Sequence, residues 1–265
     1  MNLTQAGASN ILLDANWTLR VQFKHSIANV QPTEPDMMSA FSRFALVGLV
    51  AVLAACDSDS NDPAATASLR VVHGSPDAPA VDVFVDGQSV LTNVGYQAAS
   101  PYLEVEAGTR NVQVRAAGGG ATVIDADLVK QDGDVHTVIA TNVLASIEPL
   151  VLTDDNSAPA AGNFKLRLVH GAPNVGLVDI YITAPGAALD AETPDLTNIP
   201  FKGVSSYIEA PAGQYRVRIT PAGTKTVAID TGTLDLVAGQ IRTGIAVEAT
   251  GGGAPLSALL LADRN

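Results

Sequence analysis

Histidine precedes acidic or amide residues at the same spacing in two segments of the chain. The first set is His73, Asp77 and Asp82, and the second, at matching intervals, is His170, Asn174 and Asp179. Imidazole nitrogens and carboxylate oxygens are ordinary metal ligands, and calcium accepts carboxylate and amide oxygens alike. The pattern raises the hypothesis of a metal-binding corner, weaker for a hard cation in the second set, where Asn174 replaces Asp77.

The same two segments also fit a purely structural role. Each histidine opens a His-Gly-x-Pro sequence, in which glycine permits a positive φ and proline holds φ at about −65°. An imidazole at the end of a strand can hydrogen-bond the backbone of such a turn. Because each loop supplies few ligands and the sequence shows no further partner, we favour the structural interpretation and predict no bound metal or other cofactor.

Catalytic chemistry finds little support in the sequence. There is no Gly-x-Ser-x-Gly elbow, no glycine-rich phosphate loop, and a single cysteine, Cys56. Acid-rich turns such as Asp125 and Asp127 match no EF-hand loop, so we interpret them as solvated turns. The sequence does not exclude a pair of carboxylates for glycoside hydrolysis, because two residues far apart in the chain can lie close together in space. A chain beginning at Cys56, however, has no tryptophan to line a sugar cleft. We predict that the protein is not an enzyme.

The composition bounds the class of protein. Of 265 residues, 47% are apolar and 16% are charged, which supplies ample core for one large domain or two small ones. The formal net charge of −12 leaves no basic surface for a nucleic-acid partner. One cysteine excludes an intramolecular disulfide.

An apolar segment before Cys56 carries the features of an export signal. Arg43 is followed by an uncharged run that would rise about 18 Å as a helix, short of a hydrocarbon core of about 30 Å. The run therefore predicts a signal peptide over residues 38–55 rather than a membrane span. The ending over residues 53–56, Leu-Ala-Ala-Cys, resembles the lipobox of bacterial lipoproteins.

The lipobox resemblance implies a lipid anchor. It implies that Cys56 is alkylated with diacylglycerol and becomes the first residue of a chain held on a membrane of the cell envelope, on its periplasmic or cell-surface side. We interpret residues 1–37 as an over-long start or an unstructured leader. Residues 56–68 are polar and acidic, which predicts a disordered tether.

The rest of the chain contains two copies of one unit. Residues 69–85 align without a gap with residues 166–182, and both segments begin Leu-Arg-x-Val-His-Gly. The second copy has an insertion around residues 184–196. An internal repeat of this length indicates two homologous structural units.

The repeat and the composition between its copies set the domain boundaries. We predict one domain over residues 69–153 and a second over residues 166–265. Residues 154–165 are polar and contain Pro and Gly, which is typical of a linker.

Each copy has the pattern of short β-strands separated by turns. Alternation is clean over residues 111–115, Asn-Val-Gln-Val-Arg, and Asp86-Gly87 predicts a hairpin. We predict an all-β fold of two tandem antiparallel β-sandwiches, Ig-like or transthyretin-like. The strands predicted in the first copy are 69–73, 80–86, 101–106, 110–116, 122–129, 135–141 and 144–152.

The opening of the repeat resembles a known family. Residues 69–83, Leu-Arg-Val-Val-His-Gly-Ser-Pro-Asp-Ala-Pro-Ala-Val-Asp-Val, resemble a bacterial envelope family described only as a domain of unknown function. The resemblance covers both copies, and the second departs from it at residues 174–177, Asn-Val-Gly-Leu. It implies an exported β-sandwich and brings no known active site.

These features together predict a lipid-anchored cell-envelope protein that displays two β-sandwich domains for binding or structural spacing. Its expected partners are a membrane, through the lipid anchor, and an unidentified envelope protein or glycan. The alternative is a carbohydrate- or calcium-binding accessory module of the envelope, and an unrecognised hydrolase is the remaining possibility.

Overall fold

The computed structural model describes residues 64–264, which belong to a compact unit spanning Asp59–Asn265. The predicted leader, the predicted signal peptide and Cys56 lie outside the described residues. The described part consists mainly of β-strands, with 3₁₀ turns η1 (Leu144–Ser146) and η2 (Leu189–Ala191). None of its helices is long and apolar enough to cross a membrane.

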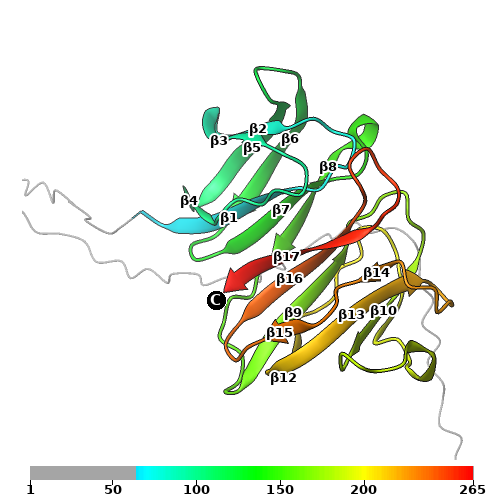
Figure 1. Cartoon of the computed structure of the whole chain (residues 1–265). Coiled ribbons are helices and arrows are strands. Elements are labelled where there is room, and N and C mark those ends of the chain that lie inside the picture. The colour runs from blue at the N-terminus through cyan, green and yellow to red at the C-terminus, as the bar shows by residue number, and fades with distance from the viewer. Residues whose placement is uncertain (1–63, 265) are drawn as a thin grey trace, which may run out of the picture. The chain divides into compact units, whose positions relative to one another are not determined.

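The prediction of an all-β fold is confirmed by strands β1 to β17 (Figure 1). The strands of the first copy are β1 (Thr66–His73), β2 (Val81–Val85), β3 (Gln88–Val94), β4 (Leu103–Glu106), β5 (Gly108–Ala116), β6 (Thr122–Lys130), β7 (Val135–Thr141) and β8 (Glu148–Thr153). Those of the second copy are β9 (Asn163–His170), β10 (Val178–Thr183), β11 (Leu196–Ile199), β12 (Ile208–Pro211), β13 (Gly213–Pro221), β14 (Ile229–Asp230), β15 (Leu234–Leu236), β16 (Ile241–Val247) and β17 (Ser257–Arg264).

Each copy folds into a sandwich of two sheets. The sheets of the first copy are β4-β1-β7-β8 and β3-β2-β5-β6, and those of the second are β12-β9-β16-β17 and β11-β10-β13-β14, with β15 also paired to β13. We call the sheets that contain β1 and β9 the inner sheets and the other two the outer sheets. Each sandwich has its own apolar core, which includes Val71 and Val83 in the first copy and Leu168 and Ile219 in the second.

One strand pairing departs from a purely antiparallel sandwich. In the first copy β1 runs parallel to β7, with Arg70 beside Thr137, and in the second β9 runs parallel to β16, with Arg167 beside Thr243. Parallel neighbours require a long crossover connection, and here most of the copy lies between the two strands along the chain. Each inner sheet is therefore complete only when a strand near the end of the copy pairs with the first strand of the same copy.

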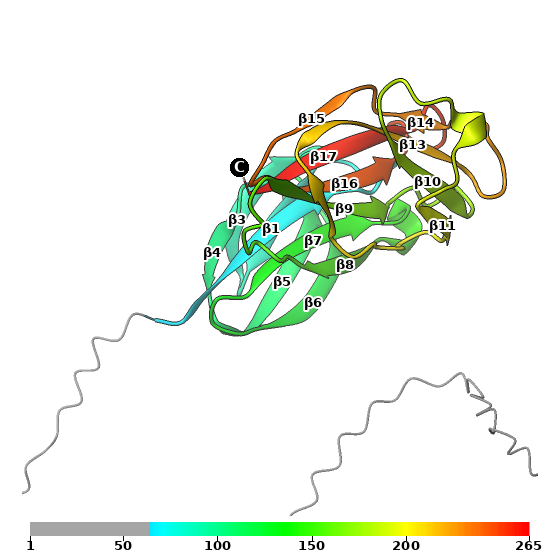
Figure 2. The same cartoon turned by 90° about the horizontal axis from the view of Figure 1, so that it is seen from below.

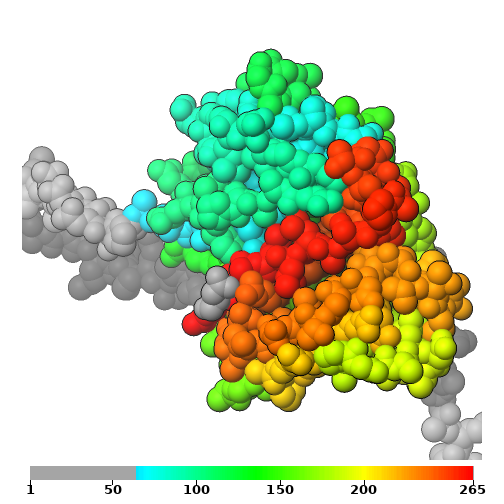
Figure 3. All heavy atoms as spheres, in the orientation of Figure 1, coloured from blue at the N-terminus to red at the C-terminus, as the bar shows by residue number. Residues whose placement is uncertain are grey.

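The two sandwiches stack through their inner sheets, so the four sheets form successive layers (Figures 1 and 2). An apolar cluster between the inner sheets draws on both copies, and its buried members are Val72, Ile139, Leu152, Val169, Ile245, Val247 and Leu261. We call this surface of contact the shared face. In the space-filling view, β17 (red) runs along the boundary between the first copy and the rest of the second (Figure 3).

Burial on both sides explains the composition of the inner strands. β1 is buried without interruption from Leu69 to His73, and β9 is buried from Phe164 to His170. A strand with one solvated face alternates apolar and polar residues, whereas a strand covered on both faces reads as a continuous apolar run. The Leu-Arg-x-Val-His openings of the two copies belong to the second kind, with arginine and histidine as the exceptions.

The predicted hairpin forms, and the strand that follows it is one that the pattern did not predict. Asp86 and Gly87 have φ values of 49° and 77°, as a two-residue turn between twisted strands requires. The next strand, β3, is exposed or half-buried at every residue, because it lies at the edge of an outer sheet. An edge strand without a buried face leaves no alternation for a sequence pattern to detect.

The glycine of each His-Gly corner fits closely against a neighbouring strand. A Cβ added at Gly171 would lie 2.8 Å from Cγ2 of Ile245 and 2.9 Å from the carbonyl oxygen of Ala246. We expect Gly171→Ala to lower the free energy of unfolding by about 1–3 kcal/mol, because the backbone must shift to admit the methyl group. Gly176→Ala, where no atom lies within 4 Å of the added Cβ, should change it by less than about 0.5 kcal/mol. Urea denaturation measures both, and equal losses would contradict this account.

Candidate functional site

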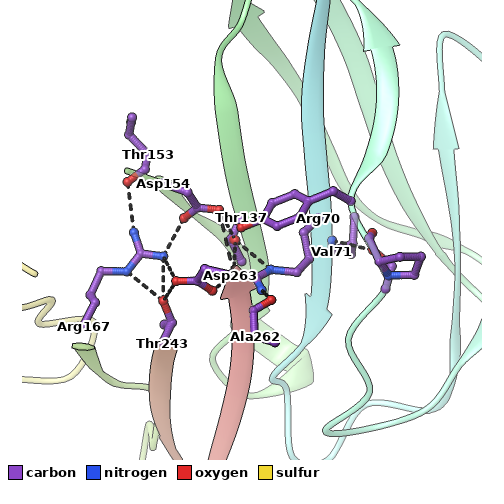
Figure 4. A network of polar contacts seen from close by, with 12 residues as sticks. Arg70, Val71, Thr137, Thr153, Asp154, Arg167, Thr243, Ala262 and Asp263 are labelled. Atoms are coloured by element: carbon purple, nitrogen blue, oxygen red, sulfur yellow. Dashed lines mark hydrogen bonds and ion pairs between the residues drawn. The ribbon is translucent and has the colours of Figure 1, made fainter. Parts of the chain in front are cut away.

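Four charged side chains meet within the shared face (Figure 4). They are Arg70 on β1, Arg167 on β9, Asp154 directly after β8 and Asp263 on β17, and we call them the Arg–Asp cluster. The arginine side chains are 3% and 4% exposed and both carboxylates are fully buried. Alternation along β1 positions Arg70: its neighbour Val71 points into the first sandwich, so the guanidinium points toward the other copy.

Each arginine makes its shortest ion pair with the aspartate of the other copy. Arg70 Nη2 lies 2.5 Å from Asp263 Oδ1 and 3.8 Å from Asp154 Oδ2. Arg167 Nη2 lies 2.5 Å from Asp154 Oδ1 and 4.0 Å from Asp263 Oδ2. The charges are therefore exchanged between the copies rather than neutralised within each.

Backbone carbonyls of the opposite copy accept a further bond from each guanidinium. Arg70 Nη1 donates to the carbonyl oxygen of Ala262 at 3.0 Å, and Arg167 Nη1 donates to that of Thr153 at 2.9 Å. The planar fork of arginine can reach a carboxylate and a carbonyl together, which a lysine ammonium on a flexible stem does less selectively.

Hydroxyl groups of the first copy complete the bonds of Asp154. Its Oδ2 accepts hydrogen bonds from Thr137 Oγ1 at 2.6 Å and from Tyr102 Oη at 2.7 Å. Thr137 Oγ1 in turn accepts a bond from Arg70 Nε at 3.0 Å, and the Arg70 guanidinium carbon lies 4.7 Å from the centre of the Tyr102 ring. Burial, together with the adjoining carboxylate, raises the pKa of Tyr102 far above its ordinary value, so the phenol keeps the proton that it donates.

The second copy repeats this arrangement contact for contact. Asp263 Oδ2 accepts hydrogen bonds from Thr243 Oγ1 at 2.6 Å and from Tyr207 Oη at 3.0 Å. Arg167 donates through Nε to Thr243 at 3.1 Å, and its guanidinium lies 4.7 Å from the centre of the Tyr207 ring. The two halves are related by a pseudo-twofold axis, as in the isologous interface of a homodimer.

The cluster is suited to holding the copies together rather than to reacting with a substrate. Two arginines and two aspartates balance each other's formal charge, and their side chains are almost fully closed to solvent. Removing an ion from water costs several kcal/mol, which is offset only when partners and hydrogen bonds surround it. Here the surrounding groups do so, which leaves no reactive position open.

A second polar contact joins the copies around Glu248, which is fully buried. Its carboxylate accepts bonds from the backbone and side-chain nitrogens of Asn174 at 2.6 and 2.9 Å and from the backbone N–H of Gly253 at 2.6 Å. Its carbonyl oxygen accepts bonds from Tyr96 Oη at 2.8 Å and Gln97 Nε2 at 3.2 Å, both in the first copy. A corner of the second copy is thereby fastened to a loop of the first.

Both histidine corners form, and in each the imidazole bonds to its own turn. His73 Nε2 lies 2.9 Å from the carbonyl oxygen of Pro79, and its Nδ1 accepts a bond from the backbone N–H of Ser75 at 3.4 Å. His170 makes the corresponding contacts, with Gly176 supplying the carbonyl at 3.0 Å. Burial lowers the pKa of His73, which favours a neutral ring that donates from Nε2.

The other residues named with the histidines lie apart from them and bond elsewhere. Asp77 accepts a bond from the first N–H of η1 at 2.7 Å, and Asn174 bonds to Glu248. Asp82 and Asp179 each accept bonds from two backbone N–H groups, one on the neighbouring outer-sheet strand (β3 or β11) and one in a turn. Within the described part of the chain, no group of three His, Cys, Asp or Glu residues is placed to hold a metal ion.

Sequence reasoning missed the Arg–Asp cluster, although its signals were present. Arg70 and Arg167 occupy the same position in the repeat, each between two apolar residues of a strand, and a charge repeated in such a place indicates a buried partner. Asp154 falls at the start of the segment predicted as a polar linker, where composition alone suggests exposure. Its burial depends on the second copy, which no local pattern describes.

The fold defines a protein of two β-sandwiches joined through their inner sheets by buried apolar and ionic contacts. The chain belongs to the family described as "Domain of unknown function (DUF4397)", whose model matches residues 67–181 and 184–265. This confirms the prediction of tandem copies of a domain of unknown function. No curated protein matches the chain.

Solved structures with similar parts have low overall similarity. The Bacillus anthracis TIE protein is 13% identical with a TM-score of 0.22, over 68% of this chain and 33% of that one. A leucine-rich repeat protein from Bacteroides thetaiotaomicron is 14% identical with a TM-score of 0.18, over 70% of this chain and 26% of that one. CBMbc (family CBM26) from Eubacterium rectale Amy13K, in complex with maltoheptaose, is 9% identical with a TM-score of 0.23, over 76% of this chain and 98% of that one. The chain matches only 33% and 26% of the first two proteins.

Removing one member of the Arg–Asp cluster should cost far more than breaking an exposed ion pair. We expect Asp263→Leu to lower the free energy of unfolding by about 3–5 kcal/mol, because Arg70 loses its nearest counter-charge inside the shared face. Glu148→Ala, the control, breaks an ion pair to Lys202 whose side chains are 40% and 39% exposed, and should cost less than about 1 kcal/mol.

The double variant Arg70→Met/Asp263→Leu sharpens this test. It removes one complete pair and leaves the Arg167–Asp154 pair intact, so it should be more stable than Asp263→Leu alone. Chemical denaturation of all four proteins gives the values. A double variant less stable than Asp263→Leu would show that unpaired burial of Arg70 is not the source of the loss.

The histidine corner should contribute to stability without a metal ion. His73→Ala should cost about 1–3 kcal/mol, since it leaves the buried Pro79 carbonyl without its donor. Calcium and EDTA should leave the melting temperature of the unmutated chain unchanged, whereas an ion at a hundredfold excess over its dissociation constant would add about 2.7 kcal/mol. Differential scanning calorimetry decides between the two roles: an EDTA-sensitive transition that His73→Ala abolishes would establish a metal site.

Proposed function

We propose that this chain is a lipid-anchored cell-envelope protein whose two-sandwich body serves, without catalysis, as a binding or spacing module. The signal-like segment, the lipobox-like ending at Cys56 and the acidic residues after it support the anchor. The paired sandwiches support a body of fixed form at the end of that anchor.

The Arg–Asp cluster is the observation that carries the proposal. Domains within one chain usually meet through modest polar interfaces and move relative to each other. Here buried ions from both copies sit inside an apolar contact, and each arginine has its nearest carboxylate on the other copy. A body held in this way presents its outer surfaces at a constant separation, which suits a spacer or a bivalent display module.

Reach and charge are consistent with display away from a membrane surface. From Cys56 to the start of β1 at Thr66, a fully extended chain covers about 30 Å at roughly 3.3 Å per residue. The Arg–Asp cluster is neutral, so it contributes nothing to the net charge of −12. A body with excess negative charge is repelled by anionic lipid headgroups, which favours an extended tether.

The carbohydrate- or calcium-binding alternative gains no specific support from the geometry. Aromatic rings that stack on sugars must present a free face, but Phe84 and Tyr181 lie under the cations of Arg115 and Lys225. The tyrosines that recur in the repeat donate to the Arg–Asp cluster. The carboxylates of Asp82 and Asp179, on outer-sheet strands, accept bonds from backbone N–H groups. We therefore favour display or spacing.

Anchoring makes a direct prediction about Cys56. Protein isolated from cells that process lipoproteins should begin at Cys56, carry a diacylglyceryl mass and enter the detergent phase, because two or more acyl chains hold firmly where one binds only marginally. Cys56→Ser should accumulate unprocessed or enter the aqueous phase, while Ser58→Ala, as a matched control in the same segment, should behave as the unmutated chain. Intact-mass measurement of an unmodified Cys56 in the membrane fraction would refute the anchor.

A further inference from the structure

The second sandwich contains an apolar cavity between its two sheets, with a volume of about 330 Å³. Its walls include Leu166, Leu168, Ile180, Val217, Ile219 and Ala246. The volume lies within the range of roughly 300–1,000 Å³ that is usual for small-molecule sites. It is also about twice that of an engineered 150 Å³ apolar cavity that stays dry and binds benzene.

One position in the wall of this cavity carries no side chain. Gly244 on β16 lines the cavity, and strand pairing places it beside Leu168, the residue after Arg167. At the same position in the first copy, Val138 lies beside Val71 and is part of the buried core. The valine that fills the first sandwich is therefore absent from the second.

An interrupted edge strand opens the cavity to solvent. In the first copy β6 pairs with β5 along an almost continuous ladder, whereas its counterpart in the second copy is divided into β14 and β15. Gly232 lies between them with a φ of 66°, a conformation that does not continue a strand. The solvent-exposed members of the lining, Asp230, Ser257, Ala258 and Leu260, lie on β14 and β17 and mark the mouth.

The lining chemistry specifies the class of ligand. The walls are aliphatic and contain no aromatic ring, which suits a flexible hydrocarbon chain rather than a sugar or a planar ring. Beside the mouth, on the face of β13 and β14 that points away from Val217 and Ile229, the guanidinium of Arg216 pairs with Asp230 and lowers the pKa of that carboxyl to about 2. Because this pair is neutral as a whole, it leaves no unbalanced charge beside the mouth.

We propose that this cavity binds the hydrocarbon chain of an uncharged single-chain amphiphile, with its polar head at the mouth. The chain would pack between the sheets of the second sandwich, against the aliphatic side chains that line the cavity. This site is independent of the lipid anchor, since it is formed entirely by residues of the second copy.

Binding of 1-octanol to the compact unit Asp59–Asn265, followed by methyl NMR, tests the proposal. We expect saturable shifts of the methyl groups of Leu168, Ile180 and Ile219, with none of comparable size in the first sandwich. Gly244→Val restores the residue of the first copy and should weaken binding at least tenfold. The added Cβ meets only the flexible end of Leu168, at 2.9 Å from Cδ2, so the sandwich can adjust to it.

Two further variants keep the experiment decisive. Gly244→Ala, a smaller change, should weaken octanol binding to an intermediate degree and serves if the valine variant does not fold. Val138→Ala, at the equivalent position of the first sandwich, should leave octanol binding unchanged. Octanoate should bind more weakly than octanol, and equal affinity would overturn the assignment of an uncharged head. An absence of saturable shifts, or shifts unaffected by both Gly244 variants, would overturn the site itself.

Discussion

Burial of four charges at one place forces the two sandwiches into a single relative position. Apolar contact is non-directional, so the shared face alone would tolerate many arrangements. Arg70 meets Asp263 only when β17 lies against the first inner sheet, and Arg167 meets Asp154 only when the chain turns directly after β8. A displaced arrangement would leave an arginine or a carboxylate buried without a partner, at a cost of several kcal/mol. The ionic contacts therefore select the geometry that the apolar contacts stabilise.

This constraint acts on the inner sheets, and the copies differ most where it does not reach. Arginine, threonine, tyrosine and aspartate recur at equivalent positions around the pseudo-twofold axis. On the far side of each sandwich, the second copy carries the 184–196 insertion with its 3₁₀ turn and the divided edge strand. The replacement of valine by Gly244 lies inside a sandwich rather than on the shared face. The two copies thus use equivalent residues on the shared face and differ in the rest of each sandwich. The core of the first sandwich contains Val138, whereas the second has a cavity lined by Gly244.

The sequence contains enough to predict the strands and the duplication, because alternation, turn residues and a gap-free repeat are local or directly comparable signals. Asp86-Gly87 is an example, since its turn type follows from two residues. The parallel pairing of β1 with β7 is different in kind, because it joins segments separated by most of a copy. The burial of Asp154 depends on a second domain. The cavity depends on how side chains from many strands pack around Gly244, which no local pattern describes. The histidine corners, in contrast, are local turns, and the bonds of His73 to its own loop are of the kind that the pattern indicates.

The position of Asp263 on β17 has a consequence for how the protein is made. The chain is synthesised from its N-terminus, and Asp263 follows Arg70 by 193 residues. At about 5–20 residues per second, Arg70 waits roughly 10–40 s for its nearest counter-charge. During that interval the inner sheet of the first sandwich lacks the cover that the second copy will give to Val72, Ile139 and Leu152. A charge among such residues opposes self-association, as gatekeeper residues do beside aggregation-prone strands. Arg70 therefore places a charge on this apolar face before its nearest counter-charge is synthesised, and the same group is a buried ion in the finished protein.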